Sequence, residues 1–219
     1  GLQHQDGHSP ILASTVPSVR TYDPAFAWEM AVLVRFGIQR MFVEDHDELF
    51  YLMMYNEALP MPARPAHDDL DEGVVRGGYL LEPAAGDGPR VNLLGSGTIL
   101  FEVMQAAETL REEGYSVAVY SITSYVELAR DAERAEQADA ADADPAWLDT
   151  IFPETDVPIV AVTDYVRALP RMIASWINGP FTALGTDGFG MSERRSDLRA
   201  HFKVDAASIA DAARKLTAS

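Results

Sequence analysis

The chain has 219 residues, of which 47% are hydrophobic and 23% charged, values typical of a globular protein. Its formal net charge of −17 argues against a surface that binds nucleic-acid phosphates, and no apolar run approaches the roughly 20 residues of a membrane-spanning helix. The sequence contains no cysteine, which excludes disulfides and thiolate ligands and is compatible with a cytoplasmic location.

The first ten residues place His4 and His8 on either side of Asp6, and the Asp6-Gly7 pair is typical of a turn. A carboxylate near an imidazole can fix its tautomer and raise its basicity, which suits proton transfer near neutral pH. Two surface histidines in a loop are the simpler interpretation, and a metal site would need a third ligand that the sequence does not indicate. Because such a loop has nothing before it to pack against, we expect that the natural chain starts earlier or that this chain is a fragment.

A short strand is expected over residues 17–22, followed by a helix over about 24–42. Asp23 is its predicted N-cap and Pro24 its first residue, the position where proline is best tolerated. The apolar run 49–55 has the length and composition of a buried parallel strand that is apolar on both faces.

The best domain boundary in the sequence follows this run. Three prolines within residues 60–65 prevent a helix, so residues 63–72 are the predicted linker. Residues 1–62 and 73–219 are then two separate units.

Beyond the linker, strands and helices alternate, which predicts right-handed crossovers and an α/β fold with a mostly parallel sheet and helices on both faces. We expect Gly114 to end the first of these helices and Pro170 to bend or restart the third. The predicted strands are 78–81, 91–94, 117–122, 159–163 and 181–184, and the predicted helices are 98–113, a helix starting near 124, 165–177, 193–201 and 205–216.

Two glycine-rich turns each lie between a strand and a helix, where backbone amides can hold an anion. The first, 95–98, lacks the full dinucleotide-binding fingerprint, so a tight turn is the favoured interpretation; the second, 185–190, is a weak pattern alone. Asp139, Asp142 and Asp144 lack the glycine and glutamate of a calcium loop. The sequence therefore predicts no cofactor-binding and no metal-binding residue.

Acidic residues are concentrated late in the chain. Between Glu127 and Asp156 lie ten carboxylates, against only Arg130 and Arg134. Such a segment could attract a basic partner protein, but a solvated surface segment is the favoured interpretation.

Six segments occur in an order and at spacings that resemble one family, the homodimeric bacterial pyruvate dehydrogenase first component, with transketolase as a more distant relative. The resemblance covers nearly the whole chain. The segments are Gly-Leu-Gln-His-Gln-Asp-Gly-His-Ser (1–9), Tyr-Asp-Pro-Ala-Phe-Ala-Trp-Glu (22–29), Tyr-Asn-Glu (55–57), Leu-Gly-Ser-Gly (94–97), 120–124 with 127–131, and Leu-Gly-Thr-Asp-Gly-Phe-Gly (184–190).

This resemblance implies that residues 1–62 are the C-terminal part of a pyrimidine-binding middle domain and that residues 73–219 form a transketolase C-terminal-like domain. It implies thiamine diphosphate and Mg²⁺ in the intact enzyme, a homodimer, and a dihydrolipoyl acetyltransferase partner in glycolysis-linked pyruvate metabolism. The family's Gly-Asp-Gly metal-diphosphate motif and its cofactor-activating glutamate are not found here in a matching context. We therefore expect the chain alone to bind no cofactor and to be inactive.

The resemblance also implies a role for His4, which matches a family active-site histidine close to the cofactor-bound intermediate, where it could give or take a proton. His8 is the weaker catalytic candidate. Gln5 departs from the pattern, because many relatives have glutamate there. Two alternatives remain: a non-catalytic dimerisation or docking module, and a related enzyme that uses another 2-oxo acid or a ketose donor.

Overall fold

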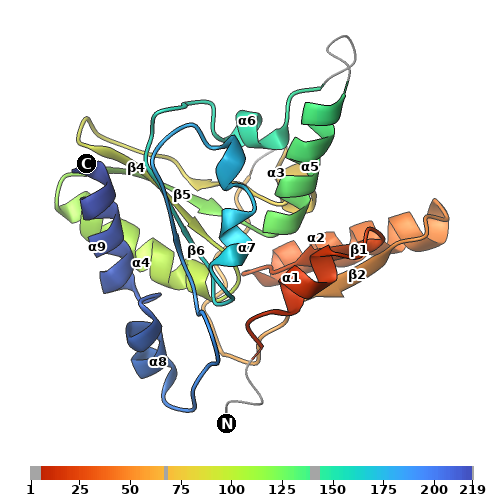
Figure 1. Ribbon diagram of the computed structural model, residues 1–219, viewed down its shortest axis with the longest axis horizontal. Coiled ribbons are helices and arrows are strands. Elements are labelled where there is room, and N and C mark those ends of the chain that lie inside the picture. Colours follow the sequence, from red (N-terminus) through yellow and green to blue (C-terminus); the bar gives the residue numbers. More distant parts are fainter. Residues whose placement is uncertain (1–5, 67–68, 139–143, 219) are drawn as a thin grey trace.

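The computed structural model describes residues 6–66, 69–138 and 144–218 and shows an α/β fold with a five-stranded sheet and a separate two-stranded sheet (Figure 1). Its strands are β1 (Val19–Tyr22), β2 (Leu49–Leu52), β3 (Tyr79–Glu82), β4 (Arg90–Gly95), β5 (Ser116–Ser121), β6 (Ile159–Val162) and β7 (Phe181–Leu184). Its α-helices are α1 (Ser9–Ser14), α2 (Ala27–Ile38), α3 (Leu70–Arg76), α4 (Ile99–Glu112), α5 (Tyr125–Gln137), α6 (Trp147–Ile151), α7 (Ala168–Arg171), α8 (Arg195–Phe202) and α9 (Ala206–Thr217). A π-helical turn, Gln39–Val43, extends α2, and a 3₁₀ turn, Ala174–Trp176, follows α7.

Five strands form the main sheet, in the order β3-β5-β4-β6-β7. Only β3 runs antiparallel to its neighbour, which confirms the mostly parallel sheet predicted from the alternation of strands and helices. Its central strands are apolar on both faces because both faces are covered by helices. Strand β4 shows this directly: Leu93 packs on one side, in the cluster with α4 and α9, whereas Leu94 packs on the other, in the cluster with α5, α6 and α7.

Local signals explain where several helices begin and end. Ser124 is the N-cap of α5, and its Oγ accepts a hydrogen bond from the Glu127 backbone N–H at 3.0 Å. Gly114 follows α4 with φ +90°, a left-handed conformation that favours glycine. Within the described ranges, no helix combines the length and apolar character needed to cross a membrane.

The N-terminal segment, residues 6–66, is built around the parallel pair β1–β2 and helix α2, and extends away from the main sheet (Figure 1). The prediction that Asp23 caps its helix was wrong. Helix α2 begins later, with Phe26 as N-cap, and the carboxylate of Glu29 accepts hydrogen bonds from the Ala25 and Phe26 N–H groups. Asp23 is instead buried against the C-terminal segment, residues 69–218.

Strand β2 is parallel to β1, as predicted, but it is not apolar and buried on both faces. Its residues alternate between exposed and half-buried: Leu49 is 63% and Tyr51 37% exposed, whereas Phe50 and Leu52 pack on the cluster of α2 and α3. A parallel pair is normally covered on both sides, so the exposed face of β2 has no cover from the described residues.

Two further local expectations differ from the structure. Helix α3 begins at Leu70, inside the predicted linker. The helix expected over 165–177 is replaced by α7 and the 3₁₀ turn, because the backbone of Tyr165 and Val166 is used in contacts with other segments. Asp205 is the N-cap of α9 but makes no capping hydrogen bond; Glu102 accepts from the first helical N–H, that of Ala206, at 2.9 Å.

Candidate functional site

The N-terminal loop that contains the two predicted histidines, here called the histidine loop (residues 4–8), is described from Asp6 onward. His4 lies outside the described residues. His8 is exposed at the start of α1. The loop is attached to the C-terminal segment by one backbone hydrogen bond, in which the Val166 N–H donates to the Gly7 carbonyl at 3.0 Å.

Asp6 does not orient the imidazole of His8. Its Oδ1 accepts hydrogen bonds from the backbone N–H groups of His8 at 3.3 Å and Ser9 at 3.0 Å, so the carboxylate orders the first turn of α1. The proposed effect of Asp6 on the His8 tautomer is therefore not supported by the geometry.

A cavity of about 260 Å³ adjoins the histidine loop and is lined by Asp6 but not by His8. It lies at the carboxyl ends of the parallel strands: Thr98 follows β4, Asp164 follows β6 and Thr186 follows β7. Strands β4 and β6 are neighbours whose connections run to opposite sides of the sheet, and ligands of open α/β sheets bind at this kind of position.

Charged groups line one wall of this cavity. The guanidinium of Arg199 donates to Glu57 at 3.3 Å and to Glu102 at 3.0 Å, and so connects the N-terminal segment to α8 and α4. Burial raises the pKa of Asp164, and the nearby positive charge of Arg199 opposes that rise. The cavity thus has both acidic and basic groups at its rim, next to the apolar side chain of Phe202.

Asp23 joins the two segments next to the cavity, where it is hydrogen-bonded to the cavity-lining residue Tyr55. Its carboxyl oxygens accept hydrogen bonds from the Tyr55 hydroxyl at 2.5 Å and the Ser96 hydroxyl at 2.7 Å. Its backbone carbonyl accepts from the Gly97 N–H at 3.0 Å, and its own N–H donates to the Thr123 carbonyl at 2.7 Å. Burial raises the pKa of Asp23 from its ordinary 3.8 to about 7, although both hydroxyl hydrogen bonds act in the opposite direction.

The glycine-rich turn 95–98 is explained by this contact. Gly97 has φ +50°, and a Cβ at this position would lie 2.4 Å from the Asp23 Oδ1 and 2.6 Å from the Tyr55 hydroxyl oxygen. The turn is tight, as favoured from the sequence, and the space that a side chain would need is filled by the N-terminal segment.

Glu29 is a second buried acid at the same interface. One oxygen accepts from the two N–H groups at the start of α2, and the other accepts from the hydroxyls of Tyr79 at 2.7 Å and Ser121 at 2.6 Å. Its pKa is raised by burial. Reasoning from the sequence missed the role of both acids; the only signal was that both lie in the segment 22–29, which was noted for its resemblance alone.

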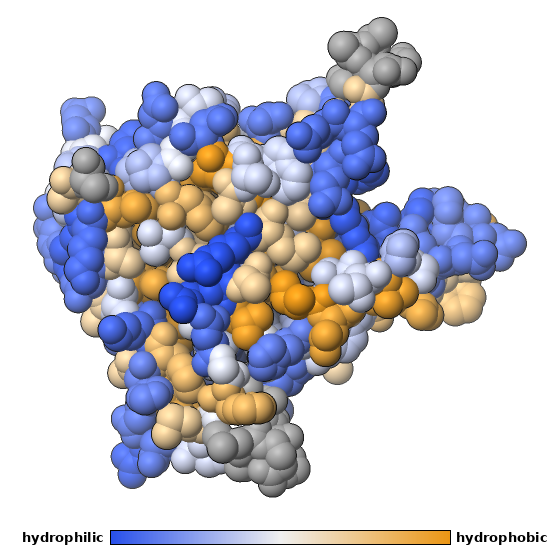
Figure 2. Space-filling view, viewed as in Figure 1, coloured by the Kyte–Doolittle hydropathy of each residue, from blue (hydrophilic) through white to orange (hydrophobic). Residues whose placement is uncertain are grey.

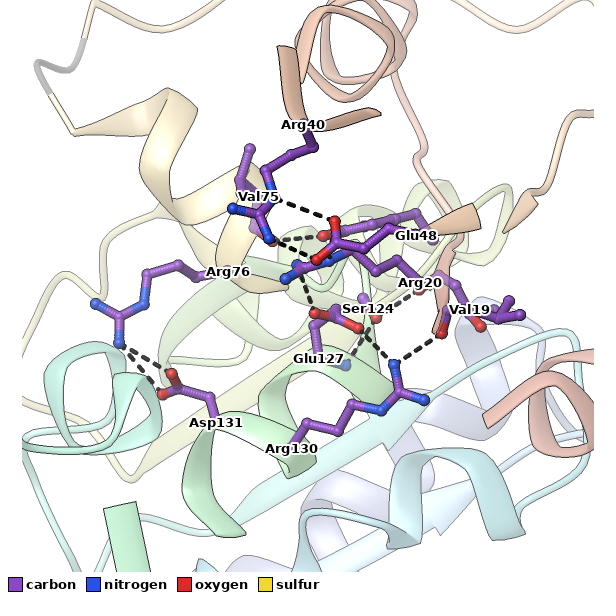
Figure 3. A network of polar contacts seen from close by, with 12 residues as sticks. Val19, Arg20, Arg40, Glu48, Val75, Arg76, Ser124, Glu127, Arg130 and Asp131 are labelled. Carbon is purple, nitrogen blue, oxygen red and sulfur yellow. Dashed lines mark hydrogen bonds and ion pairs between the residues drawn. The ribbon is translucent and has the colours of Figure 1, made fainter. Parts of the chain in front are cut away.

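A network of ion pairs around Glu127 also joins the two segments (Figure 3). Glu127 of α5 is only 8% exposed in its side chain and accepts from Arg20 at 2.8 Å and Arg130 at 3.1 Å. Arg20 also pairs with Glu48 at 3.1 Å. Glu127 belongs to the acidic segment favoured as solvated surface, so for this residue that interpretation was wrong: its charge serves an internal contact.

The turn 185–190 contributes Thr186 and Gly190 to the lining of the cavity, whereas its other residues point to no ligand. In the turn 185–190, Asp187 pairs with Arg167, and Phe189 is 76% exposed. The tripeptide Gly86-Asp87-Gly88 lies in the loop before β4, at the amino ends of the parallel strands and so at the edge of the sheet opposite the cavity. Among the described residues, no group of three or more His, Cys, Asp or Glu could hold a metal ion.

Comparisons with known proteins agree with this architecture. Residues 1–62 match the pyruvate dehydrogenase E1 component middle domain, and residues 77–205 match the transketolase-like C-terminal domain. The transketolase from Leishmania mexicana superposes on all of the chain with a TM-score of 0.71 at 19% sequence identity, and the chain covers 28% of that protein. A split-gene transketolase, an inactive beta4 tetramer, superposes on all of the chain with a TM-score of 0.70 at 14% identity, and the chain covers 64% of it. At this identity, both likenesses show the fold alone.

Sequence relatives are more similar. The chain is 44% identical over 216 residues to the pyruvate dehydrogenase E1 component of Corynebacterium glutamicum and 40% identical over 228 residues to that of Escherichia coli K12. These matches include 95% and 97% of this chain but only 23% and 24% of the relatives, so the chain spans about a quarter of their length. From the two consecutive domain matches and these relatives, the chain belongs to the pyruvate dehydrogenase E1 component family, with a transketolase-like C-terminal domain.

Proposed function

We propose that this chain is the C-terminal part of a pyruvate dehydrogenase E1 component, an acetyl-transferring enzyme that decarboxylates pyruvate and reductively acetylates a lipoyl group of a dihydrolipoyl acetyltransferase partner. The observation that supports the proposal is the consecutive match to two domains of that family, together with 40–44% identity to relatives of that name. In the intact enzyme, thiamine diphosphate with Mg²⁺ would supply the carbanion-stabilising chemistry.

The contribution of this chain to catalysis would come from the histidine loop. We assign His4 the exchange of a proton between its imidazole and an oxygen of the reacting substrate, a role suited to histidine near neutral pH. Two observations on the described part of the loop support this role: Asp6 lines the cavity, and the Gly7 carbonyl accepts a hydrogen bond from the Val166 N–H. His8 is the weaker candidate because it is exposed and does not line the cavity.

The described residues do not fit thiamine diphosphate and Mg²⁺ by themselves. The cavity at the strand ends is lined by paired arginines and carboxylates, and the Gly-Asp-Gly tripeptide lies at the other edge of the sheet. We therefore assign the cofactor site to polypeptide outside this chain, which would complete the cleft.

Exposed apolar surface supports this assignment. Figure 2 shows apolar surface over the area that α1 and the β1–β2 pair occupy in Figure 1. Leu12 of α1 is 67% exposed, Leu49 of β2 is 63% exposed and Met54, just after β2, is 79% exposed. Side chains of this size are usually buried, so further polypeptide of the same enzyme is the proposed cover. The intact protein would be a cytoplasmic homodimer.

Replacement of His4 in the full-length protein tests the proposed function. His4→Ala should remove most of the pyruvate-dependent activity and leave the dimer intact, as measured by the reduction of a dichlorophenolindophenol dye and by light scattering. His46→Ala, at a half-exposed histidine after the π-helical turn, is the matched control and should retain activity. Undiminished turnover by His4→Ala would refute the role of His4.

Isothermal calorimetry of the 219-residue chain tests where the cofactor is held. Titration with thiamine diphosphate and Mg²⁺ should give no saturable heat, whereas full-length protein should bind both. Micromolar binding by the isolated chain would show that the cofactor site was wrongly assigned to the remainder of the enzyme. The mass of the native polypeptide is the companion measurement: about four times that of this chain is expected from the relatives.

A further inference from the structure

Two series of contacts meet at the Asp23 carboxyl, and both start at Tyr165. In the first, the Tyr165 N–H donates to the Thr163 hydroxyl at 3.3 Å, the Thr163 and Ser96 hydroxyl oxygens are 3.1 Å apart, and Ser96 donates to Asp23. Because the Ser96 proton is given to Asp23, the Thr163 hydroxyl must be the donor to Ser96.

The second series consists of tyrosine hydroxyls. The Tyr165 and Tyr55 side chains lie close enough for each to influence the pKa of the other, and the Tyr55 hydroxyl donates to Asp23. The backbone of Tyr165 is therefore connected to this buried acid by hydrogen bonds, and its side chain lies near the Tyr55 hydroxyl that is bonded to the same acid.

Tyr165 adjoins the residue that holds the histidine loop. The next N–H along the chain, that of Val166, donates to the Gly7 carbonyl, and the Tyr165 carbonyl accepts from the Thr186 N–H at 2.8 Å. The negative charge of Asp6 also contributes to the raised pKa of the Tyr165 hydroxyl. A shift of Tyr165 would thus be transmitted to the backbone of the histidine loop.

We infer that Asp23 is a positioning residue for catalysis: through Tyr55, Ser96 and Tyr165 it fixes the strand-end segment 163–166 that holds the histidine loop beside the cavity. The inference rests on the proposed function, since it assigns the loop a part in the reaction. Asp23 does not line the cavity and touches no substrate, so its effect is indirect. Tyr55 links it to the cavity wall.

Kinetics of full-length protein with single oxygen atoms removed test this inference. Tyr55→Phe and Tyr165→Phe should lower kcat for pyruvate by about tenfold to a hundredfold, the scale expected for a displaced catalytic group, with KM changed less than about threefold. Tyr125→Phe is the matched control, because Tyr125 is also buried but its hydroxyl has no hydrogen-bond partner among the described residues; it should retain kcat. A double variant Tyr55→Phe/Asp23→Asn should be no slower than the slower single variant, because the residues act in one series.

Amide hydrogen exchange provides a readout that does not depend on activity. In Tyr165→Phe, the Val166 amide should exchange at least about fivefold faster than in the wild type, the factor that corresponds to one hydrogen bond, and in Tyr125→Phe it should not change. Unchanged exchange, or faster exchange with unchanged kcat, would overturn the inference. If the wild-type protein does not turn over pyruvate, the proposed function fails, and the exchange rates still decide whether Tyr165 holds the loop.

Discussion

Replacement of Glu127 by glutamine is the sharpest test of how the two segments are held together. Glutamine has nearly the shape of glutamate but only one acceptor oxygen, so one of the two arginines loses its hydrogen bond to residue 127. Its amide would then face the guanidinium of Arg20 or of Arg130, with donors on both sides. The change therefore removes a charge from a contact that excludes most water.

The magnitude follows from the geometry. Hydrogen bonds to charged groups contribute about 1.5–3 kcal/mol each, and breaking a buried ion pair costs about 3–5 kcal/mol. Because the side chains of Arg20 and Arg130 remain 24% and 22% exposed, solvent compensates part of that loss. We expect Glu127→Gln to lower the free energy of unfolding by about 2 kcal/mol.

Urea denaturation of the 219-residue chain, followed by circular dichroism at 222 nm, is the assay. With a slope of about 2 kcal/mol per molar urea, the expected loss lowers the midpoint by about 1 M. Glu133→Gln, at an exposed position on the same helix, is the control and should change the free energy by less than about 0.5 kcal/mol. Equal shifts for the two variants would refute the reasoning, as would a Glu127→Gln effect that vanishes in 0.5 M salt, because buried pairs are screened little.

Two further predictions concern the contact of Asp23 next to the cavity. Gly97→Ala should lower the free energy of unfolding by about 3 kcal/mol or prevent folding, because its Cβ would meet Asp23 and Tyr55. The control is Gly86→Ala, at a glycine with φ +88° and nothing within 4 Å, which should lower the free energy of unfolding by only about 1 kcal/mol. Equal losses for the two variants in thermal unfolding would contradict the contact. The pKa of Asp23 is raised to about 7 in the folded chain, so its protonated form stabilises the fold below about pH 4. This contribution to the free energy of unfolding, at most about 4 kcal/mol, is lost as the pH rises through 7. The difference in unfolding free energy between wild type and Asp23→Asn should therefore shift in favour of the variant between pH 4.5 and 8, and a difference that is independent of pH would exclude the raised pKa.

Much of the candidate site could not be predicted from the sequence. The pattern and the resemblance predict a functional role for the histidine loop, and Asp6 lines a cavity. Asp23 was taken for a helix cap, because an acid before proline and an apolar run has the same local signature in both roles. Only its distance from Ser96, far away in the chain, distinguishes a cap from a buried acid at an interface.

The sequence alone determined the elements whose signals are local. Apolar runs between turns predicted the strands of the main sheet, Gly114 ended α4 and Ser124 capped α5, because hydrogen bonds between near neighbours decide those choices. Tertiary structure decided which acids are buried and which face of β2 is covered, because desolvation depends on groups distant in sequence. Glu127 shows the difference: its place on α5 follows from the sequence, whereas its burial follows from the two arginines that the fold brings to it.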